Sequence, residues 1–217
     1  MARKSQEQLI AQYHEMSVHE NQLREKGYVY IAGIDEAGRG PLAGPVVAGA
    51  VILQPDTDLV IPGIDDSKKL TALRRAKLLE EIKEKAIAWS VGIADVETID
   101  RINILQATKQ AMKMAVDGLK VQPQVLMVDA VELPEISLPQ QPLIHGDALS
   151  VSIAAASIVA KETRDAMMVA MDELYPEYGF ASNKGYGSAQ HIAALRQYGP
   201  CPIHRRTFIK NFVESNE

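Results

Sequence analysis

The sequence predicts an α/β protein in which a mixed sheet is flanked by helices and followed by a helical C-terminal region. Two short apolar runs come first, between residues 28 and 53, and only a Gly/Pro-rich loop separates them. Strand-like runs and helical patterns then alternate, and the last part of the chain is helical. Strands joined directly favour antiparallel pairing and strands joined through a helix favour parallel pairing, so both kinds of neighbour are expected.

The first half of the chain supplies three strands and two helices. The strand predictions rest on short apolar runs with aromatic or β-branched residues, and the helix predictions on apolar residues at helical spacing. Three glycines and two prolines make the segment between the first two strands a loop, and Ser67 or Thr71 can cap the first helix. The predicted elements are a strand at Tyr28–Asp35, a strand at Pro45–Leu53, a helix at Thr71–Ala86, a strand at Ile87–Ala94 and a helix at Thr98–Leu119.

The second half contains one more short strand and is otherwise helix and loop. The strand is a buried apolar run that ends at an aspartate, and Pro176 ends the long helix that follows. The predicted elements are a strand at Val125–Val128, a Pro-rich connection through Pro134, Pro139 and Pro142, a helix at Ser150–Leu174, a Gly/Tyr-rich loop, a helix at Ala189–Tyr198 and a basic tail.

The composition is that of a globular protein with one large domain. Hydrophobic residues make up 47% of the 217 residues and charged residues 24%. The formal net charge of −5 argues against a generally basic nucleic-acid coat, so any polyanion must be held by a local patch. The single cysteine, Cys201, excludes an internal disulfide and favours a reducing compartment. No apolar run approaches the roughly 18–20 residues that cross a bilayer, so we expect a cytoplasmic, monomeric protein that does not bind membranes.

Residues 1–27 are predicted to form a helical extension ahead of the main domain, residues 28–217. The extension has basic residues but no continuous apolar core or cleavage-like ending, so it does not read as a secretory signal. Leu9, Tyr13, Met16 and Leu23 indicate a weakly amphipathic helix. Two interpretations remain open: a solvated extension that packs loosely on the body, or a helix that binds a partner.

Two acidic residues, Asp35 and Glu36, end the first predicted strand, and a loop with an arginine between two glycines follows them. Adjacent carboxylates repel each other, so desolvating the pair costs stability unless a cation neutralises it. Gly38 and Gly40 let the backbone approach a ligand while the guanidinium of Arg39 reaches a phosphate. Acids that favour a divalent metal, close to a loop that favours a polyanion, indicate metal-assisted chemistry on a phosphate backbone.

Two further acids support this interpretation: Asp129 follows an apolar strand, and Asp147 precedes the long helix. Neighbouring strands lie only about 4.8 Å apart, so carboxylates at the ends of adjacent strands converge. Four oxygen donors without a histidine or cysteine pattern suit Mg²⁺, or Mn²⁺ as a substitute. Other roles stay open, because Asp147 can be a helix N-cap, Asp129 a solvated strand end, and Asp35–Glu36 a solvated pair.

Several motifs resemble those of the ribonuclease HII family, the type 2 ribonucleases H. The longest motif is Gly33–Val47, which is too long and unusual to be explained by chance. The other motifs follow in the family's order: Asp66–Leu70, Val128–Ala130, Gly146–Asp147, Ile153–Lys161, Asn183–Gly187 and His204–Phe208. Together they extend from about Tyr28 to Phe208.

This resemblance implies a ribonuclease H-like fold and a metal-dependent endonuclease that uses two Mg²⁺ or Mn²⁺ ions. The implied substrate is an RNA–DNA hybrid or a single ribonucleotide embedded in duplex DNA, cut on the 5′ side of the ribonucleotide, a step that starts ribonucleotide removal from DNA. The implied catalytic and metal-binding residues are Asp35, Glu36, Asp129 and Asp147. Gly38, Arg39 and Gly40 would read the ribose 2′-hydroxyl, and Tyr186 would stack on the sugar at the RNA–DNA junction.

Seven basic residues in or near these motifs are candidates for phosphate contacts. They are Lys68, Lys69, Lys161, Lys184, Arg205, Arg206 and Lys210, of which Lys69 and Lys210 fit a solvated surface better. The family usually has a lysine where this chain has His145, so a phosphate contact there would be pH-sensitive or absent. His191 and His204 lack zinc spacing and are interpreted as core or surface histidines, and Cys201 as a loop residue.

Two other functions compete with this interpretation. Another nuclease of the same fold, such as an integrase or resolvase, would use strand-end acids without a 2′-hydroxyl reader. A non-catalytic duplex-binding protein could keep the fold, although the presence of all four acids argues against it. A nucleotide-binding loop is not supported, because no Gly-rich loop ends in Lys-Ser or Lys-Thr.

Overall fold

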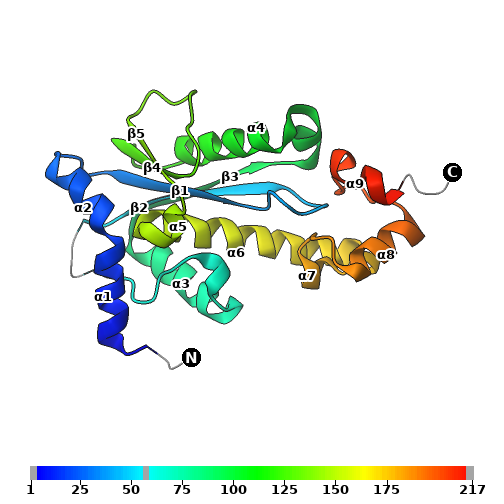
Figure 1. Cartoon of the computed structure of the whole chain (residues 1–217), viewed down its shortest axis with the longest axis horizontal. Coiled ribbons are helices and arrows are strands. Elements are labelled where there is room, and N and C mark those ends of the chain that lie inside the picture. Colours follow the sequence, from blue (N-terminus) through cyan, green and yellow to red (C-terminus); the bar gives the residue numbers. More distant parts are fainter. Residues whose placement is uncertain (1–3, 56–58, 214–217) are drawn as a thin grey trace.

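A computed structural model describes residues 4–55 and 59–213 and contains a five-stranded mixed sheet (Figure 1). The strand order is β3-β2-β1-β4-β5. The pairs β1–β2 and β2–β3 are antiparallel, and the pairs β1–β4 and β4–β5 are parallel. The strands are β1 (Ile31–Ala37), β2 (Val46–Leu53), β3 (Ala86–Ala94), β4 (Val125–Asp129) and β5 (Gln140–Leu143). The predicted combination of parallel and antiparallel neighbours is confirmed.

Helices cover both faces of the sheet, with α4 on one face and α6 and α3 on the other (Figure 1). The C-terminal helices gather at the far end of α6, away from the N-terminal pair. The helices are α1 (Gln6–Met16), α2 (Val18–Glu25), α3 (Ala72–Lys85), α4 (Val96–Asp117), α5 (Gly146–Leu149), α6 (Val151–Leu174), α7 (Phe180–Asn183), α8 (Ala189–Tyr198) and α9 (Arg206–Val213), with short 3-10 turns at η1 (Ser67–Lys69) and η2 (Pro176–Tyr178).

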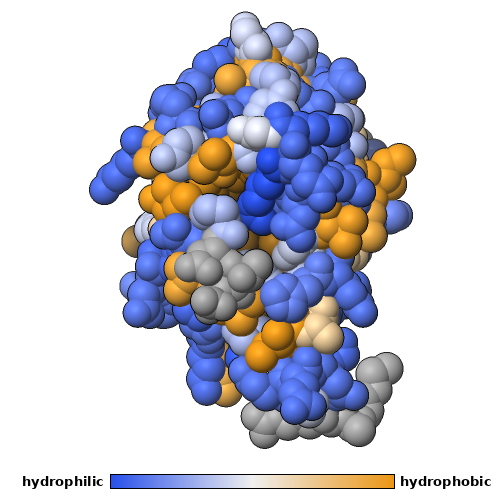
Figure 2. Space-filling view, turned by 90° about the vertical axis from the view of Figure 1, so that its left-hand side faces the viewer, coloured by the Kyte–Doolittle hydropathy of each residue, from blue (hydrophilic) through white to orange (hydrophobic). Residues whose placement is uncertain are grey.

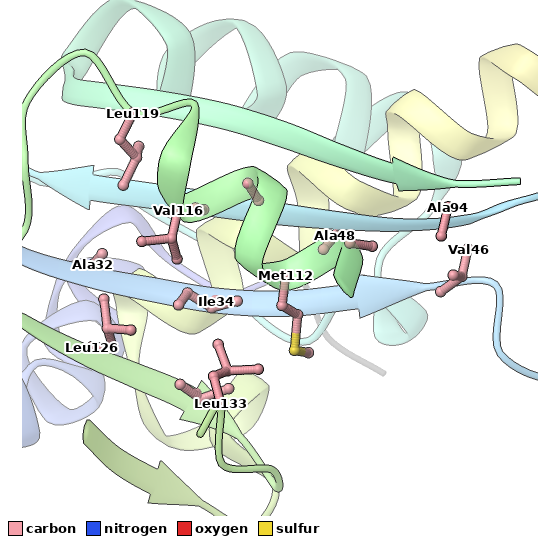
Figure 3. Close-up of a cluster of buried hydrophobic side chains, with 14 of the residues drawn as sticks. Ala32, Ile34, Val46, Ala48, Ala94, Met112, Val116, Leu119, Leu126 and Leu133 are labelled. Carbon is pink, nitrogen blue, oxygen red and sulfur yellow. The ribbon is translucent and has the colours of Figure 1, made fainter. Parts of the chain in front are cut away.

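Apolar side chains fill the space between the sheet and α4. Ile34 and Leu126 from the sheet meet Met112 and Val116 from the helix, and Figure 3 shows these side chains pointing toward one another. Successive residues of a strand face opposite sides, so the alternation that buries Ile34 under α4 turns Asp35 toward α6. The strand period therefore places an acid on the side where the long helix begins.

Close packing of α6 against the sheet depends on two glycines. A Cβ at Gly33 would lie 2.1 Å from the backbone of Ser152, and a Cβ at Gly49 would lie 2.4 Å from the carbonyl oxygen of Ala156. The small residues at the start of α6, which are fully or almost fully buried, complete this contact. The helix therefore lies directly on the strands that carry the acids.

Two predictions for the second half of the chain need correction. The predicted Pro-rich connection contains strand β5, which forms the edge of the sheet, where Pro142 is tolerated because an edge strand needs fewer backbone donors. The predicted basic tail contains α9, whose Ile209 is buried. The segment of β5 lacks an alternating apolar pattern, whereas Phe208, Ile209 and Phe212 stand at helical spacing in α9 and were an available signal.

The N-terminal segment packs closely on the body, which argues against the interpretation of a loosely packed, solvated extension. Tyr13 and Met16 of α1 join the core beneath α6, and Leu23 of α2 contacts Ile31 and Val125 at the start of the sheet. Figure 2 views the molecule from this side, where hydrophilic side chains surround separate hydrophobic areas. The division at residue 27 into extension and main domain stays a prediction.

Within the described parts of the chain, none of the helices has the combination of length and apolarity needed to span a bilayer.

Candidate active site

The sheet and α5 bring the four predicted acids to one region. Ile34 of β1 is paired with Val128 of β4, so the next residues of these parallel strands, Asp35 and Asp129, are neighbours. Asp147 belongs to α5, which follows β5, the other neighbour of β4. The amide of Gly146 donates to Oδ1 of Asp129 at 2.7 Å and so joins α5 to the end of β4.

Asp147 is not the cap of the long helix. The N-cap of α6 is Ser150, whose hydroxyl accepts a hydrogen bond from the amide of Ile153. Asp147 is buried in α5, the short helix before α6, and its carboxylate lies 3.6 Å from the ammonium of Lys68. Its side chain is therefore free of a capping role and lies toward the other acids.

Burial and mutual repulsion both disfavour charge in this acid cluster, defined as Asp35, Glu36, Asp129 and Asp147. Burial raises the pKa of Asp35 well above its usual value, and the charges of Glu36 and Asp129 raise it further. Burial also raises the pKa values of Glu36 and Asp147, and Asp129 adds to both shifts. Asp129 is thus the common neighbour of the other three carboxylates.

The donor set of the acid cluster fits a hard divalent cation. Carboxylate oxygens are the ligands that Mg²⁺ and Mn²⁺ prefer, and a cation would relieve the repulsion that raises these pKa values. In residues 4–55 and 59–213 no three acidic, histidine or cysteine side chains are close enough to form a ready-made cage. Mg²⁺ is commonly held by one or two carboxylates with water and substrate phosphate, so an open site is compatible with it.

The predicted substrate loop borders the acid cluster. Glu36, Gly38, Arg39 and Gly40 line a groove together with Tyr186. A Cβ at Gly40 would lie 3.7 Å from the Tyr186 ring, so the loop and the tyrosine are close neighbours. The Arg39 side chain is 47% exposed and its guanidinium lies 3.5 Å from Glu36, which leaves it accessible to an anion.

Arg205 needs a correction, because it was predicted to contact phosphate. Its side chain is fully buried, and burial together with the charge of Arg164 lowers its pKa to about 9. The guanidinium donates to the carbonyls of Gly38 at 2.5 Å and Arg39 at 2.9 Å, and further to those of Gly44 and Pro45. Arg205 therefore supports the glycine loop from beneath and has no face turned to substrate.

Arg164 is a second buried support that sequence reasoning missed. It lies in α6, is 1% exposed, and donates to the carbonyls of Ala43, Pro45 and Lys184. Among the described residues neither Arg164 nor Arg205 forms an ion pair, so backbone carbonyls alone compensate both charges. Nothing in the local pattern of α6 distinguishes Arg164 from a solvated helix residue.

The lysines predicted to contact phosphate, and His145, have different surroundings. Lys68 is exposed at the edge of the acid cluster, and Lys161 lines the groove while pairing with Asp165 at 2.6 Å. Lys184 has a left-handed backbone with φ of 52°, and its ammonium donates to the carbonyl of Ala181. His145 is exposed with φ of 59°, directly before α5. Lys68 is thus the lysine best placed beside the acids.

A kink in α4 contributes an unpredicted part of the groove. Asn103 has φ of 66° within the helix, and its side chain accepts from the amides of Leu105 and Gln106, so it caps the second half of α4. Ile104 follows this kink and lines the groove together with Phe208. The prediction of a continuous helix missed the kink, although an asparagine that tolerates positive φ was the available signal.

Comparisons with known proteins identify relatives over most of the chain. The family model described as Ribonuclease HII matches residues 32–211. A ribonuclease HII from Desulfitobacterium hafniense (strain DSM 10664 / DCB-2) is 61% identical over 189 residues, covering 87% of this chain and 72% of that protein. A ribonuclease HII from Acetivibrio thermocellus is 55% identical over 207 residues, covering 95% of this chain and 80% of the relative.

Solved structures with the same arrangement confirm the ribonuclease H-like fold. The ribonuclease H2 from Pyrococcus horikoshii OT3 has a TM-score of 0.69 at 29% identity, covering 85% of this chain and 97% of that chain. Bst-RNase HIII in complex with Mn²⁺ has a TM-score of 0.61 at 20% identity, covering 92% of this chain and 68% of that one, and shows likeness of fold alone. The extent of the family model and the identity to the two ribonucleases HII together establish that this chain belongs to the ribonuclease HII family.

Proposed function

We propose that this protein is an endoribonuclease that cuts the RNA strand of RNA–DNA hybrids and cuts at single ribonucleotides embedded in duplex DNA. Membership of the family fits ribonuclease H activity on RNA–DNA. The proposal adds that the cut falls on the 5′ side of the ribonucleotide, leaves a 5′-phosphate and a 3′-hydroxyl, and starts ribonucleotide removal from DNA. The observation that carries it is the single groove shared by Glu36 of the acid cluster, the loop at Gly38–Gly40 and Tyr186.

The acid cluster is proposed to hold the divalent ions, with Asp129 as the acid whose charge acts on all three others. Two bound ions, Mg²⁺ or Mn²⁺, would supply an activated water and charge stabilisation for the leaving 3′-oxygen. Asp35 faces α6 and is almost completely buried, which fixes its carboxylate and excludes bulk water from it. Lys68 offsets part of the negative charge beside Asp147 and is accessible to a substrate phosphate.

Selection of RNA over DNA is proposed to depend on the loop that Arg164 and Arg205 support. The 2′-hydroxyl distinguishes the two nucleic acids, and a site that hydrogen-bonds it rejects the deoxy analogue strongly. Gly38 and Gly40 have no side chain that would keep the backbone away from a sugar. The ring of Tyr186 is 48% exposed beside Gly40, so it can stack on the next sugar.

The decisive experiment compares three labelled duplexes: one with a single ribonucleotide, one continuous RNA–DNA hybrid and one all-DNA duplex. Each is incubated with Mg²⁺, Mn²⁺ or a chelator, and the position and end groups of the nick are mapped. We expect metal-dependent nicks on the 5′ side of the ribonucleotide and an intact all-DNA duplex. Equal cutting of all-DNA would instead support a nuclease of the integrase or resolvase type, and binding without cutting would support a non-catalytic protein.

A further inference from the structure

Two buried histidines lie beneath the tyrosine of the groove. His191 of α8 is 0% exposed and His204, just before α9, is 1% exposed. Their Nε2 atoms are 3.0 Å apart. Nδ1 of His191 is 2.9 Å from the carbonyl oxygen of Tyr186, and Nδ1 of His204 is 3.0 Å from the backbone nitrogen of Cys201. These contacts form one continuous chain from Cys201 to Tyr186.

The partners at the two ends determine where the protons lie. The amide of Cys201 can only donate, so Nδ1 of His204 accepts and the neutral ring carries its proton on Nε2. That proton can only be donated to Nε2 of His191, which therefore carries its own proton on Nδ1. The carbonyl of Tyr186 can only accept, and it receives this last proton. Every donor in the chain thus has an acceptor when both rings are neutral.

The surroundings keep both rings neutral. Burial lowers the pKa of His191, and burial together with the neighbouring His191 lowers the pKa of His204 to about 4. The rings of Tyr178 and Phe180 pack against both histidines. The titratable and charged groups around this cluster are Tyr178, Cys201, Arg206 and Glu177. Sγ of Cys201 lies 3.1 Å from Nδ1 of His204, but burial raises the pKa of this thiol, so it stays protonated and does not favour a charged imidazole. Among the described residues, no carboxylate is hydrogen-bonded to either ring.

Tyr186 needs such an anchor because its own ring has little to hold it. The ring is half exposed, and glycines at 185 and 187 flank it. The backbone amide of Tyr186 donates to Asn183 at 2.9 Å, and its carbonyl also accepts from the amide of Ser188 at 2.8 Å. The imidazole of His191 is the only side chain among the described residues that bonds the carbonyl of Tyr186. The histidine therefore adds a buried side-chain bond to the two backbone bonds that orient this peptide.

We propose that the His191–His204 pair is a positioning device that orients Tyr186 over Gly40 and thereby determines how strongly the protein prefers an RNA–DNA junction to a continuous hybrid. The two histidines act through Tyr186 and do not touch substrate. This inference rests on the proposed function for its catalytic readout. The hydrogen-bond chain itself is a property of the free protein and is tested without substrate.

The first test is nitrogen-15 NMR of the histidine rings in the full-length wild-type protein at neutral pH, where long-range couplings report each tautomer. We expect His191 to carry its proton on Nδ1 and His204 on Nε2, with both rings neutral. Finding the opposite tautomer at His191, or a charged ring at either position, overturns the proposal. This result does not depend on whether the protein cleaves RNA–DNA substrates.

The second test compares His191→Phe, His191→Asn and the control His14→Phe, which makes the same change at an exposed position of α1. Phenylalanine fills the ring volume but cannot donate, whereas asparagine can donate from near the Nδ1 position. We expect His191→Phe to lower the ratio of kcat/KM on a single-ribonucleotide duplex to kcat/KM on a continuous hybrid by about tenfold. His191→Asn should recover most of this ratio, and His14→Phe should leave it unchanged.

An unchanged ratio in folded His191→Phe overturns the positioning role. An equal loss on both substrates, without recovery by His191→Asn, also overturns it, because that outcome indicates general destabilisation. Failure of the proposed function itself would look different, since the wild-type protein would then cut neither substrate. Near-ultraviolet circular dichroism verifies that each variant is folded before the ratio is measured.

Discussion

The amide of Gly146 donates a 2.7 Å hydrogen bond to Oδ1 of Asp129, and this bond joins the segment that carries Asp147 to the strand end beside Asp35. Asp129 therefore has two roles in the geometry of the acid cluster. One carboxylate oxygen orients α5, and the charge of the group raises the pKa values of the other three acids. A substitution that keeps the acceptor oxygen separates these roles.

Asp129→Asn should fold normally and lose most of its nuclease activity. The amide oxygen of asparagine still accepts from Gly146, but the charge that binds a cation is gone. We expect a rate loss of about three orders of magnitude or more, equivalent to roughly 4 kcal/mol at about 1.36 kcal/mol per decade. Single-turnover cleavage measures this loss, with exposed Asp117→Asn at the end of α4 as the matched control. A folded Asp129→Asn protein that cleaves at the wild-type rate would refute the assignment.

Asp35→Asn should stabilise the metal-free protein at neutral pH. The folded state raises the pKa of Asp35 above its value in the unfolded chain, near 3.8. Between these two pKa values the unfolded chain loses the proton more readily, so stability falls as pH rises through this range. Asparagine keeps an oxygen that accepts from the Glu36 amide and removes the charge. We expect a gain of about 1–2 kcal/mol in unfolding free energy in chelator.

Thermal unfolding in chelator and in Mg²⁺ measures the effect of this change. Added Mg²⁺ should raise the Tm of the wild-type protein more than that of Asp35→Asn, because the ion relieves the same repulsion. A variant less stable than the wild type in chelator at pH 7 would contradict the electrostatic argument.

Glu20→Ala should destabilise the protein more than Glu20→Gln. Oε1 of Glu20, which is fully buried, accepts from the Ser150 hydroxyl at 2.6 Å and the Ser152 amide at 3.0 Å. Alanine leaves two buried donors without a partner, for a cost on the order of 2–3 kcal/mol, whereas glutamine keeps the acceptor. Urea unfolding measures both, and exposed Glu15→Ala on α1 is the control. Equal stability of all three variants would show that the bonds from Glu20 of α2 to the start of α6 do not stabilise the protein.

Lys68→Ala and Arg205→Met, which both remove a positive charge, should differ in their dependence on salt. Lys68 is exposed, so removing it should reduce the slope of log binding constant against log salt by about one phosphate contact. Arg205 is buried under the loop, so the uncharged methionine should lower stability without changing that slope. Fluorescence anisotropy with a labelled hybrid in chelator measures the slopes. A smaller slope for Arg205→Met would restore Arg205 as a phosphate contact.

Protonation linked to His204 should reduce stability as pH falls from about 6.5 toward 4, opposite in sign to the contribution of the buried acids. The folded state lowers the pKa of His204 to about 4, so below 6.5 the unfolded chain binds a proton that the folded chain rejects. The loss from this group approaches roughly 3 kcal/mol when pH reaches 4. Urea unfolding across this range should show a smaller pH dependence for His204→Gln, and an identical pH dependence would contradict the assignment.

Local sequence patterns were sufficient to predict β1 to β4, the long helices and the acids at the strand ends. Period-2 and period-3.6 spacing of apolar residues records which face of each element is buried, and this information lies within a few neighbouring residues. The helix at Ala189–Tyr198 was confirmed with its predicted bounds. The proposed roles of Gly38, Arg39, Gly40 and Tyr186 came from the family motifs, because the spacing of apolar residues carries no information about them.

Other features depended on partners distant in the chain. Arg205 is buried because it bonds carbonyls about 160 or more residues earlier, Arg164 because the same loop surrounds it, and Glu20 because it meets the start of α6. A charged side chain has the same local pattern whether it is solvated or buried, since only the three-dimensional arrangement of acceptors decides which is stable. The acids were therefore predictable from sequence, whereas the residues that hold the groove in shape became apparent only in the folded protein.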